Sequence, residues 1–256
     1  MSQQAFGSGI MWATPQSDAS GAAIAVPPSL LFGIMQDVSV DISGDIKELF
    51  GMNTYPYVTA KGKSKIAIKA KTAQIYAALF NGVFHGQTLA AGIYAMNYDT
   101  AGAPIPSPSG PYTITPAVPN SGTWDHDLGV IGTTGLPYKK VAPGTPTAGQ
   151  YCVTAGVYTF AAADAAKTVF INYAYTATST VAQSETVMNQ PMGYAPTFQL
   201  DLFMPFQGKS KCLTFFACIS TKLAMATKID DFMIPELDMS AFADPAGRVF
   251  KWSTSE

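Results

Sequence analysis

The stretch "MQDVSVDISGDIKELFG", residues 35–51, alternates between apolar and polar side chains along most of its length. One parity holds Val38, Val40 and Ile42, and the other holds Asp37, Ser39, Asp41 and Ser43. Successive side chains of a strand point to opposite faces, so the stretch predicts a β-strand with one apolar face and one acidic face. The apolar face suits a protein core, so the acidic face must be exposed to solvent or to another molecule.

A second alternating stretch, residues 58–71, is rich in lysine. Its other parity carries Ile66 and Ile68, which again predicts a half-buried strand. Opposite charges stabilise each other across neighbouring strands, so we expect these lysines to lie opposite acids, in a subunit seam, or on an outer surface. The lysines are Lys61, Lys63, Lys65, Lys69 and Lys71.

The hydrophobic period changes at Thr72. In "TAQIYAALFNGVF", residues 72–84, Ile75, Leu79 and Val83 fall on one helical stripe. This spacing predicts an α-helix over about 72–84 that packs through those three residues, with Thr72 as its N-cap.

The rest of the chain divides by composition. Residues 1–28 are rich in Gly, Ser, Ala and Gln and predict an extended N-terminal arm. Residues 29–256 predict a single β domain, because strand-like stretches return from about residue 151 onward. Pro and Gly are dense between residues 98 and 150, which predicts a loop-dominated insertion without a core of its own.

Composition limits the function. Only 12% of the 256 residues are charged, against ~25% in ordinary soluble domains. Either uncharged polar side chains cover the surface, or much of that surface is an interface, since interface cores are poor in charge. The net charge of −2 gives no basic field for nucleic acid, and we expect no membrane segment or targeting signal. Three cysteines in so long a chain predict reduced thiols.

The residues of catalysis are scarce. The chain has only two histidines, and no phosphate-binding, nucleophile-elbow or metalloprotease motif occurs. "WDHDLG", residues 124–129, is the best metal candidate, but Asp125 and Asp127 would point away from His126 on a strand, so a polar turn is the preferred interpretation. We therefore expect a protein that is not an enzyme, with no catalytic residue, no metal site and no cofactor.

Three segments together resemble the major tail tube proteins of long-tailed bacteriophages with flexible, non-contractile tails. The segments are "LLFGIMQDVSVDISGDIKELFGMNTYPYVTAKGKSKIAIKAKTAQIYAALFNGVF" (30–84), "GVYTFAAADAAKTVFINYAYT" (156–176) and "DDFMIPELDMSAFADPAGRVFKWSTSE" (230–256). They cover roughly half of the chain, and the region 98–150 departs most. The resemblance implies a mainly β fold, a β-sandwich or partial barrel flanked by one helix.

The resemblance also implies an assembly. Six copies form a ring, inner strands of the six join into a lumenal β-barrel, and stacked rings make a tube, a plan shared with type VI secretion tube proteins. The implied partners are further copies of the chain, a tape-measure protein in the lumen, tail terminator and distal tail proteins, and double-stranded DNA that passes without specific binding. The implied location is the virion tail tube, assembled in the host bacterial cytoplasm.

On this interpretation the acidic parity becomes a lumen wall that repels DNA, because a basic wall would bind its phosphates. The candidate seam residues are Met11, Trp12 and Ile24 of the arm together with Lys61, Lys63, Lys65 and Lys69. The alternative hypothesis is a monomeric β-sandwich binding module for carbohydrate or a host surface. Its recognition aromatics would be Tyr112, Trp124 and Tyr138.

Overall fold

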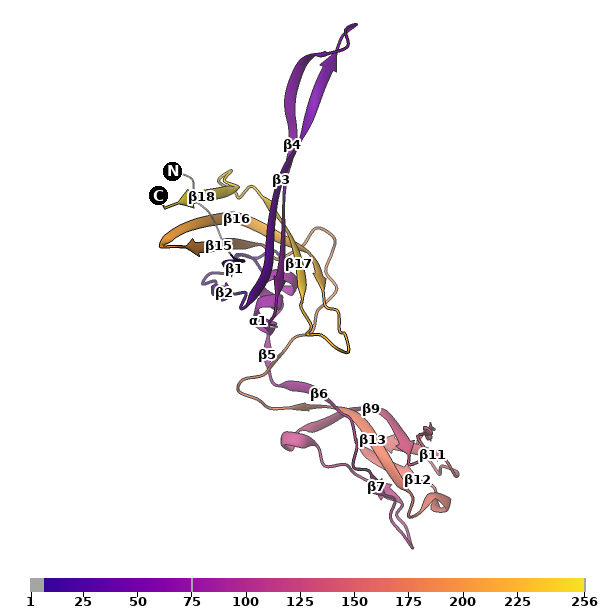
Figure 1. Ribbon diagram of the computed structural model, residues 1–256. Coiled ribbons are helices and arrows are strands. Elements are labelled where there is room, and N and C mark those ends of the chain that lie inside the picture. The colour runs from indigo at the N-terminus through magenta and orange to yellow at the C-terminus, as the bar shows by residue number, and fades with distance from the viewer. Residues whose placement is uncertain (1–6, 75, 256) are drawn as a thin grey trace. The chain divides into compact units, whose positions relative to one another are not determined.

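Two long strands, β3 (Met35–Phe50) and β4 (Pro56–Thr72), form an antiparallel hairpin in the computed structural model, which describes residues 7–74 and 76–255. The register places Asp37 opposite Lys71 and Val40 opposite Ile68. Polar residues therefore pair with polar residues on one face, and apolar residues pair on the other. The far end of the hairpin projects well beyond the strands next to it (Figure 1).

The hairpin is one end of an eight-stranded sheet. Its order is β2-β1-β15-β16-β17-β4-β3, with β18 also paired to β16, and all of these pairs are antiparallel. The order ends at β2 and β3, so this sheet stays open. The remaining strands are β1 (Ile10–Pro15), β2 (Leu30–Leu31), β15 (Phe198–Phe206), β16 (Lys209–Ala224), β17 (Glu236–Phe242) and β18 (Phe250–Thr254).

The helix is shorter than the sequence predicts. It consists of α1 (Ala77–Phe80) and a π-helical turn, η1 (Asn81–His85), rather than residues 72–84. Thr72 is not an N-cap. It ends β4 opposite Met35, and its buried hydroxyl donates to the Phe32 carbonyl at 2.7 Å, which keeps the chain extended.

The end of η1 is fixed by a side chain and a glycine. The Asn81 amide donates to the Gln87 carbonyl at 2.6 Å, and its oxygen accepts from the Gln87 N–H at 2.7 Å. Gly86 follows with φ of 59°, the left-handed conformation that commonly ends helices. Leu79 and Val83 of the predicted packing face are buried, and Ile75 lies outside the described residues.

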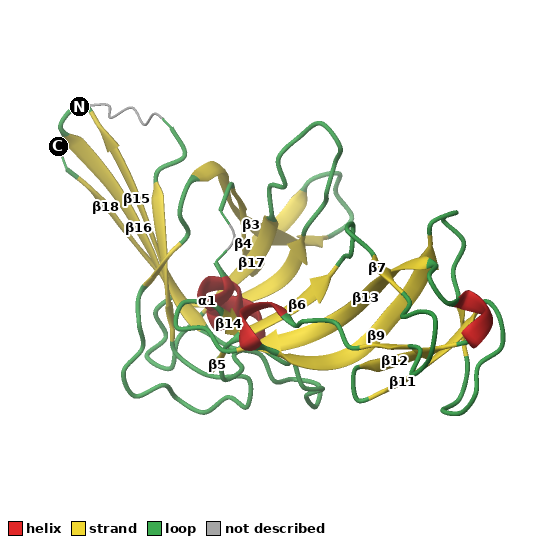
Figure 2. Ribbon diagram, turned by 90° about the horizontal axis from the view of Figure 1, so that it is seen from below, coloured by secondary structure: helices red, strands yellow, loops and turns green. Residues whose placement is uncertain are grey.

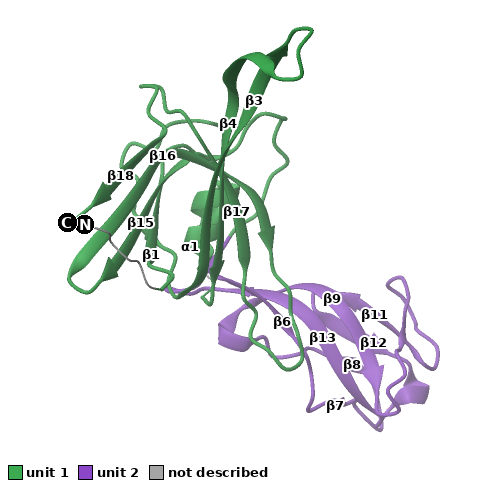
Figure 3. Ribbon diagram, turned by 45° about the horizontal axis from the view of Figure 1, so that its top comes forward, with its two compact units in different colours: residues 1–89, 185–256 green, residues 90–184 purple. Residues whose placement is uncertain are grey.

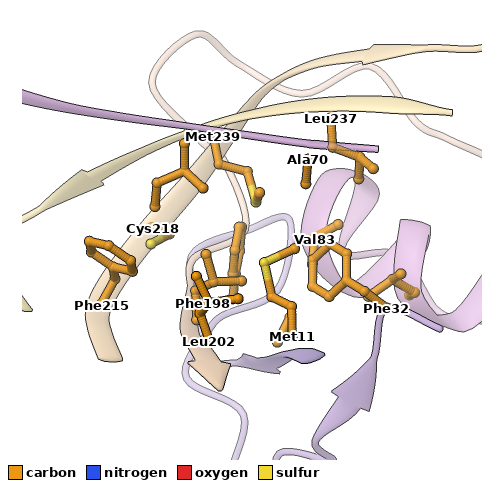
Figure 4. Packing of buried hydrophobic residues seen from close by; sticks show 14 of the residues in the cluster. Met11, Phe32, Ala70, Val83, Phe198, Leu202, Phe215, Cys218, Leu237 and Met239 are labelled. Atoms are coloured by element: carbon orange, nitrogen blue, oxygen red, sulfur yellow. The ribbon is translucent and has the colours of Figure 1, made fainter. Parts of the chain in front are cut away.

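One face of the sheet and the helical segment enclose the first core. Met11, Phe198, Phe215 and Met239 come from separate strands and point into a shared interior with Val83 (Figure 4). Met11 is fully buried, so residues 10–15 of the expected free arm are a strand of this sheet. The alternation in "IMWATP" is only six residues long, which is too short to stand out in a Gly- and Ser-rich segment.

The chain contains a second compact unit at residues 90–184, and residues 1–89 and 185–256 make up the first (Figure 3). Two four-stranded sheets build most of it, ordered β10-β11-β12-β8 and β6-β13-β7 with β9 on β13, and β5 pairs with β14. The elements are β5 (Ala90–Ala91), β6 (Ile93–Asn97), β7 (Ala103–Pro104), β8 (Thr113–Ile114), η2 (Pro119–Ser121), β9 (Thr123–Gly132), β10 (Lys139–Lys140), β11 (Gln150–Thr154), β12 (Val157–Phe160), η3 (Ala162–Asp164), β13 (Thr168–Ala177) and β14 (Gln183–Ser184).

The second unit has its own core, which corrects the expected coreless insertion at 98–150. Tyr151 and Tyr158 from one sheet and Tyr173 from the other are almost completely buried. The predicted bounds of the insertion, 98–150, are narrower than the second unit, 90–184. Strand β13, at 168–177, pairs with β9, at 123–132, and eight of the ten buried residues of this core lie after residue 150.

The fold class is mainly β. Strands dominate both units, several sheets are present, and the only α-helix among the described residues is the short α1 (Figure 2). A β-sandwich-like class is consistent with these sheets. The second unit, with two sheets around one core, is the clearer example.

Candidate functional site

The solvent-facing side of the first unit's sheet carries alternating columns of charge, here called the charged face. Acids lie on β3, lysines on β4, acids on β17 and a lysine on β16. Register places Ser39 opposite Lys69, Lys69 opposite Asp238 and Asp238 opposite Lys222. The charged face comprises Asp37, Asp41, Glu236 and Asp238 with Lys65, Lys69, Lys71 and Lys222.

Lys71 makes the shortest ion pair within the charged face. Its Nζ lies 2.9 Å from Oε1 of Glu236, and Lys222 Nζ lies 3.9 Å from the other oxygen of the same carboxylate. The hydrogen bond to Glu236 raises the pKa of Lys71, and Asp37 adds to this effect. The same hydrogen bond lowers the pKa of Glu236. Both groups are therefore held in their charged forms.

The predicted lumen residues lie together on this side of the sheet. Ser39 and Ser43, like Asp37 and Asp41, are exposed and face away from the core. They share their surface with lysines of β4, however, because Asp37 pairs with Lys71 and Ser43 with Lys65. The expectation that lysines lie opposite acids on neighbouring strands is confirmed for Lys71 and Lys69, so the acidic residues of β3 belong to a mixed face. Within the charged face, four carboxylates accompany four lysines.

The far end of the β3–β4 hairpin, residues 44–64, is here called the projecting hairpin. Lys61 and Lys63 lie on it and are exposed. Its most evident feature is apolar. Phe50 is 55% exposed and Tyr57 85% exposed, and none of its large apolar side chains belongs to either core. The exposed set is Ile46, Leu49, Phe50, Met52, Tyr55, Tyr57 and Val58.

Sequence reasoning missed the projecting hairpin as a functional surface. The signal was present in "FGMNTYPYV", residues 50–58, where a hairpin end carries Phe, Met and two Tyr. Exposed hairpin ends ordinarily favour Gly, Asn, Asp and other polar residues. Large apolar residues at such a position indicate a surface that another molecule covers.

The candidate seam residues of the N-terminal segment do not form one surface. Met11 is buried in the first core, so it is not available to another subunit, whereas Trp12 is half-buried on the opposite side of β1. Ile24 is half-buried and lines a cavity of about 260 Å³ together with Pro28 and Leu30. These contacts tie the segment to its own unit.

The "WDHDLG" residues do not converge on a metal. They lie on β9 rather than in a turn. Asp127 is 3% exposed, accepts from the Tyr151 hydroxyl at 2.8 Å and pairs with Lys140 at 2.9 Å. Asp125 and His126 contact each other at 2.6 Å on the exposed side. Within the described ranges, 7–74 and 76–255, no three His, Cys, Asp or Glu side chains gather as a metal site would require.

The three aromatics of the binding-module hypothesis help to form the second core. Tyr112, Trp124 and Tyr138 are half-buried and pack against it. The Trp124 indole donates to the Tyr158 hydroxyl at 3.3 Å. Each of these side chains therefore packs on the core with one part and leaves only the remainder exposed. The exposed aromatics of the second unit are instead Tyr94, at 50%, and Tyr98, at 78%.

No protein-family model matches the sequence, and a comparison with curated protein sequences finds no match. Of the helices that the structure describes, none is long and apolar enough to cross a bilayer. Function must therefore be inferred from the surfaces themselves.

Proposed function

We propose that this chain is the structural subunit of a bacteriophage tail tube, in which hexameric rings stack into the conduit for genome ejection. The observation that carries the proposal is the projecting hairpin with its large exposed apolar side chains. Full burial of one such side chain is worth about 1.5–3 kcal/mol. A surface that gains this much when covered suits a protein whose copies cover one another.

Two further features support self-assembly. Strand β3 is sixteen residues long and ends the sheet order, so its outer edge offers backbone groups to another strand. The low charge content of 12% suits a chain with much interface. Together with the resemblance of residues 30–84 to tail tube proteins, these features favour a ring in which sheets of neighbouring copies join into one lumenal barrel.

Electron microscopy tests the proposal. Purified protein at rising concentration should form rings or tubes in negative stain, with a matching rise of mass in sedimentation velocity. Phe50→Ser with Tyr57→Ser should abolish tubes and leave a folded protein. The matched control is Leu136→Ser with Val181→Ser, which removes two apolar side chains from the second unit that are at least as exposed and should leave tubes intact. A wild-type protein that stays monomeric at every concentration would contradict the proposal.

A second candidate function rests on the second unit alone. Tyr94 and Met96 project from the same side of β6, and Tyr98 follows just beyond its end, so a short apolar and aromatic strip lies exposed. Tyrosine rings flanked by polar groups can stack on sugar rings, which suits a carbohydrate-binding module. Binding of the full-length protein to a panel of immobilised glycans, lost in Tyr94→Ala with Tyr98→Ala, would support this function.

A further inference from the structure

We infer that the charged face is a masked polyanion surface, in which the acids of β3 and β17 cancel a lysine array that would otherwise bind duplex DNA. The inference rests on the proposed function for its setting, a tube through which DNA passes. It differs from an acidic wall, because the acids act on neighbouring lysines rather than on the DNA.

The lysines and the acids that mask them are neighbours on adjacent strands. Paired residues on neighbouring strands hold their Cβ atoms about 4.5–5.5 Å apart. Lys71 therefore lies between Asp37 on one side and Glu236 on the other, and Lys69 lies beside Asp238. The Debye length at physiological salt is about 8 Å, so Lys71 and Lys69 each act on a passing phosphate together with an acidic neighbour, as a nearly neutral group.

The pattern also explains why the acids stand where they do. A column of lysines alone would align positive charges along β4. These charges would repel each other, and binding DNA would be favourable because it releases counterions from the phosphates. Acids on both sides of Lys71 and on one side of Lys69 reduce the attraction without creating a strongly negative surface. A balanced face neither holds a DNA duplex nor expels it, which suits rapid passage.

A gain of binding tests the inference. Asp37→Asn with Asp41→Asn removes the two acids of β3 and leaves four lysines against two acids on the charged face. At low salt this variant should bind a short fluorescent DNA duplex about tenfold more tightly than the wild type, and the affinity should fall with salt at a slope of about −2 to −4 on logarithmic axes. Fluorescence anisotropy measures both quantities on unassembled protein.

Two companion variants make the result specific. Asp18→Asn with Asp125→Asn changes the net charge equally, but its carboxylates lie outside the charged face, and it should bind DNA no better than wild type. Adding Lys69→Gln and Lys71→Gln to the first variant should restore the balance and abolish the gain. Circular dichroism establishes that all variants are folded.

The outcomes separate the two proposals. Equal DNA binding by wild type and Asp37→Asn with Asp41→Asn would overturn the masked surface, and so would an equal gain in the Asp18 and Asp125 control. A specific gain in a protein that never forms rings or tubes would support the masked surface and contradict the tail tube.

Discussion

The two units of this chain solve the problem of apolar burial differently. The second unit closes its core between two sheets, with Tyr158 from one and Tyr173 from the other inside. The first unit covers one face of an open sheet and leaves the projecting hairpin uncovered. A sheet pair completes its burial within one chain, whereas an open sheet with an apolar hairpin leaves part of its burial to other molecules. If the two units differ in this way, deletions and substitutions in one unit should leave the stability of the other unchanged.

The largest effect is expected from deletions. Removing residues 90–184 and joining 89 to 185 with a short Gly/Ser linker should leave the first unit folded, because its core contains no residue from that range. Removing only residues 98–150 should instead leave the second unit unfolded, because β13 loses β9. Thermal unfolding by circular dichroism and calorimetry would show one intact transition for either deletion. If deletion of residues 90–184 also unfolded the first unit, the two units would not be independent.

Substitution of Met11 shows whether residues 10–15 act as a core strand or as an arm that docks on another subunit. Met11→Ala should lower the free energy of unfolding of the first unit by about 2–5 kcal/mol, because it leaves a cavity in a fully buried site. Trp12→Ala, on the half-buried side of the same strand, should cost less than half as much. Denaturant titration measures both. A Met11→Ala protein of normal stability that fails to assemble would restore the docking-arm interpretation.

Asp127 tests the second unit in the same way. Burial opposes ionisation of its carboxyl group, but hydrogen bonds from Lys140, Tyr151 and the Gly129 N–H outweigh burial and hold its pKa below 3.8. Asp127→Asn should cost about 1–3 kcal/mol at neutral pH, and Asp125→Asn should change stability little. Because the pKa is lowered by folding, the contribution is present above pH 3.8 and is lost as pH falls through the folded-state pKa. Chemical unfolding of wild type and Asp127→Asn should therefore converge in acid.

The smallest effect belongs to the charged face. The pKa of Glu236 is lowered from 4.5 and that of Lys71 is raised from 10.5, so their contribution exists between those values. It is lost as pH falls through the folded-state pKa of Glu236 or rises through that of Lys71. Both side chains are exposed, so Glu236→Gln should lower the melting temperature only slightly at pH 7, and this loss should shrink as pH falls through the folded-state pKa of Glu236. A large loss at pH 7 would mean that this pair is a structural element of the sheet.

The β3–β4 hairpin was the most predictable part of the fold. Its strands follow a period of two over many residues, and both the apolar and the polar parity were assigned from the sequence. The lysines and acids could also be expected to meet, but a strand pattern does not give the register. Only the register shows that Lys71 lies between Asp37 and Glu236, which is 165 residues further along the chain.

Other features could not be predicted from the sequence because they depend on contacts between residues far apart in the chain. Thr72 was assigned to a helix cap on local grounds, yet its hydroxyl bonds to Phe32, forty residues away. The second core was missed because β13 and β9 are separated by a stretch dense in Pro and Gly. The apolar end of the projecting hairpin was visible in the sequence, but only the structure shows that its side chains belong to neither core.

The short pair β5 and β14 has a practical consequence. It sets Ala90 opposite Ser184 and Ala91 opposite Gln183, so the chain enters and leaves residues 90–184 at neighbouring points. Antiparallel partners lie about 5 Å apart, which is the spacing of termini in many small domains. The segment can therefore be exchanged like a cassette. An epitope, an enzyme or a fluorescent protein whose two ends lie close together could be grafted there in place of residues 90–184.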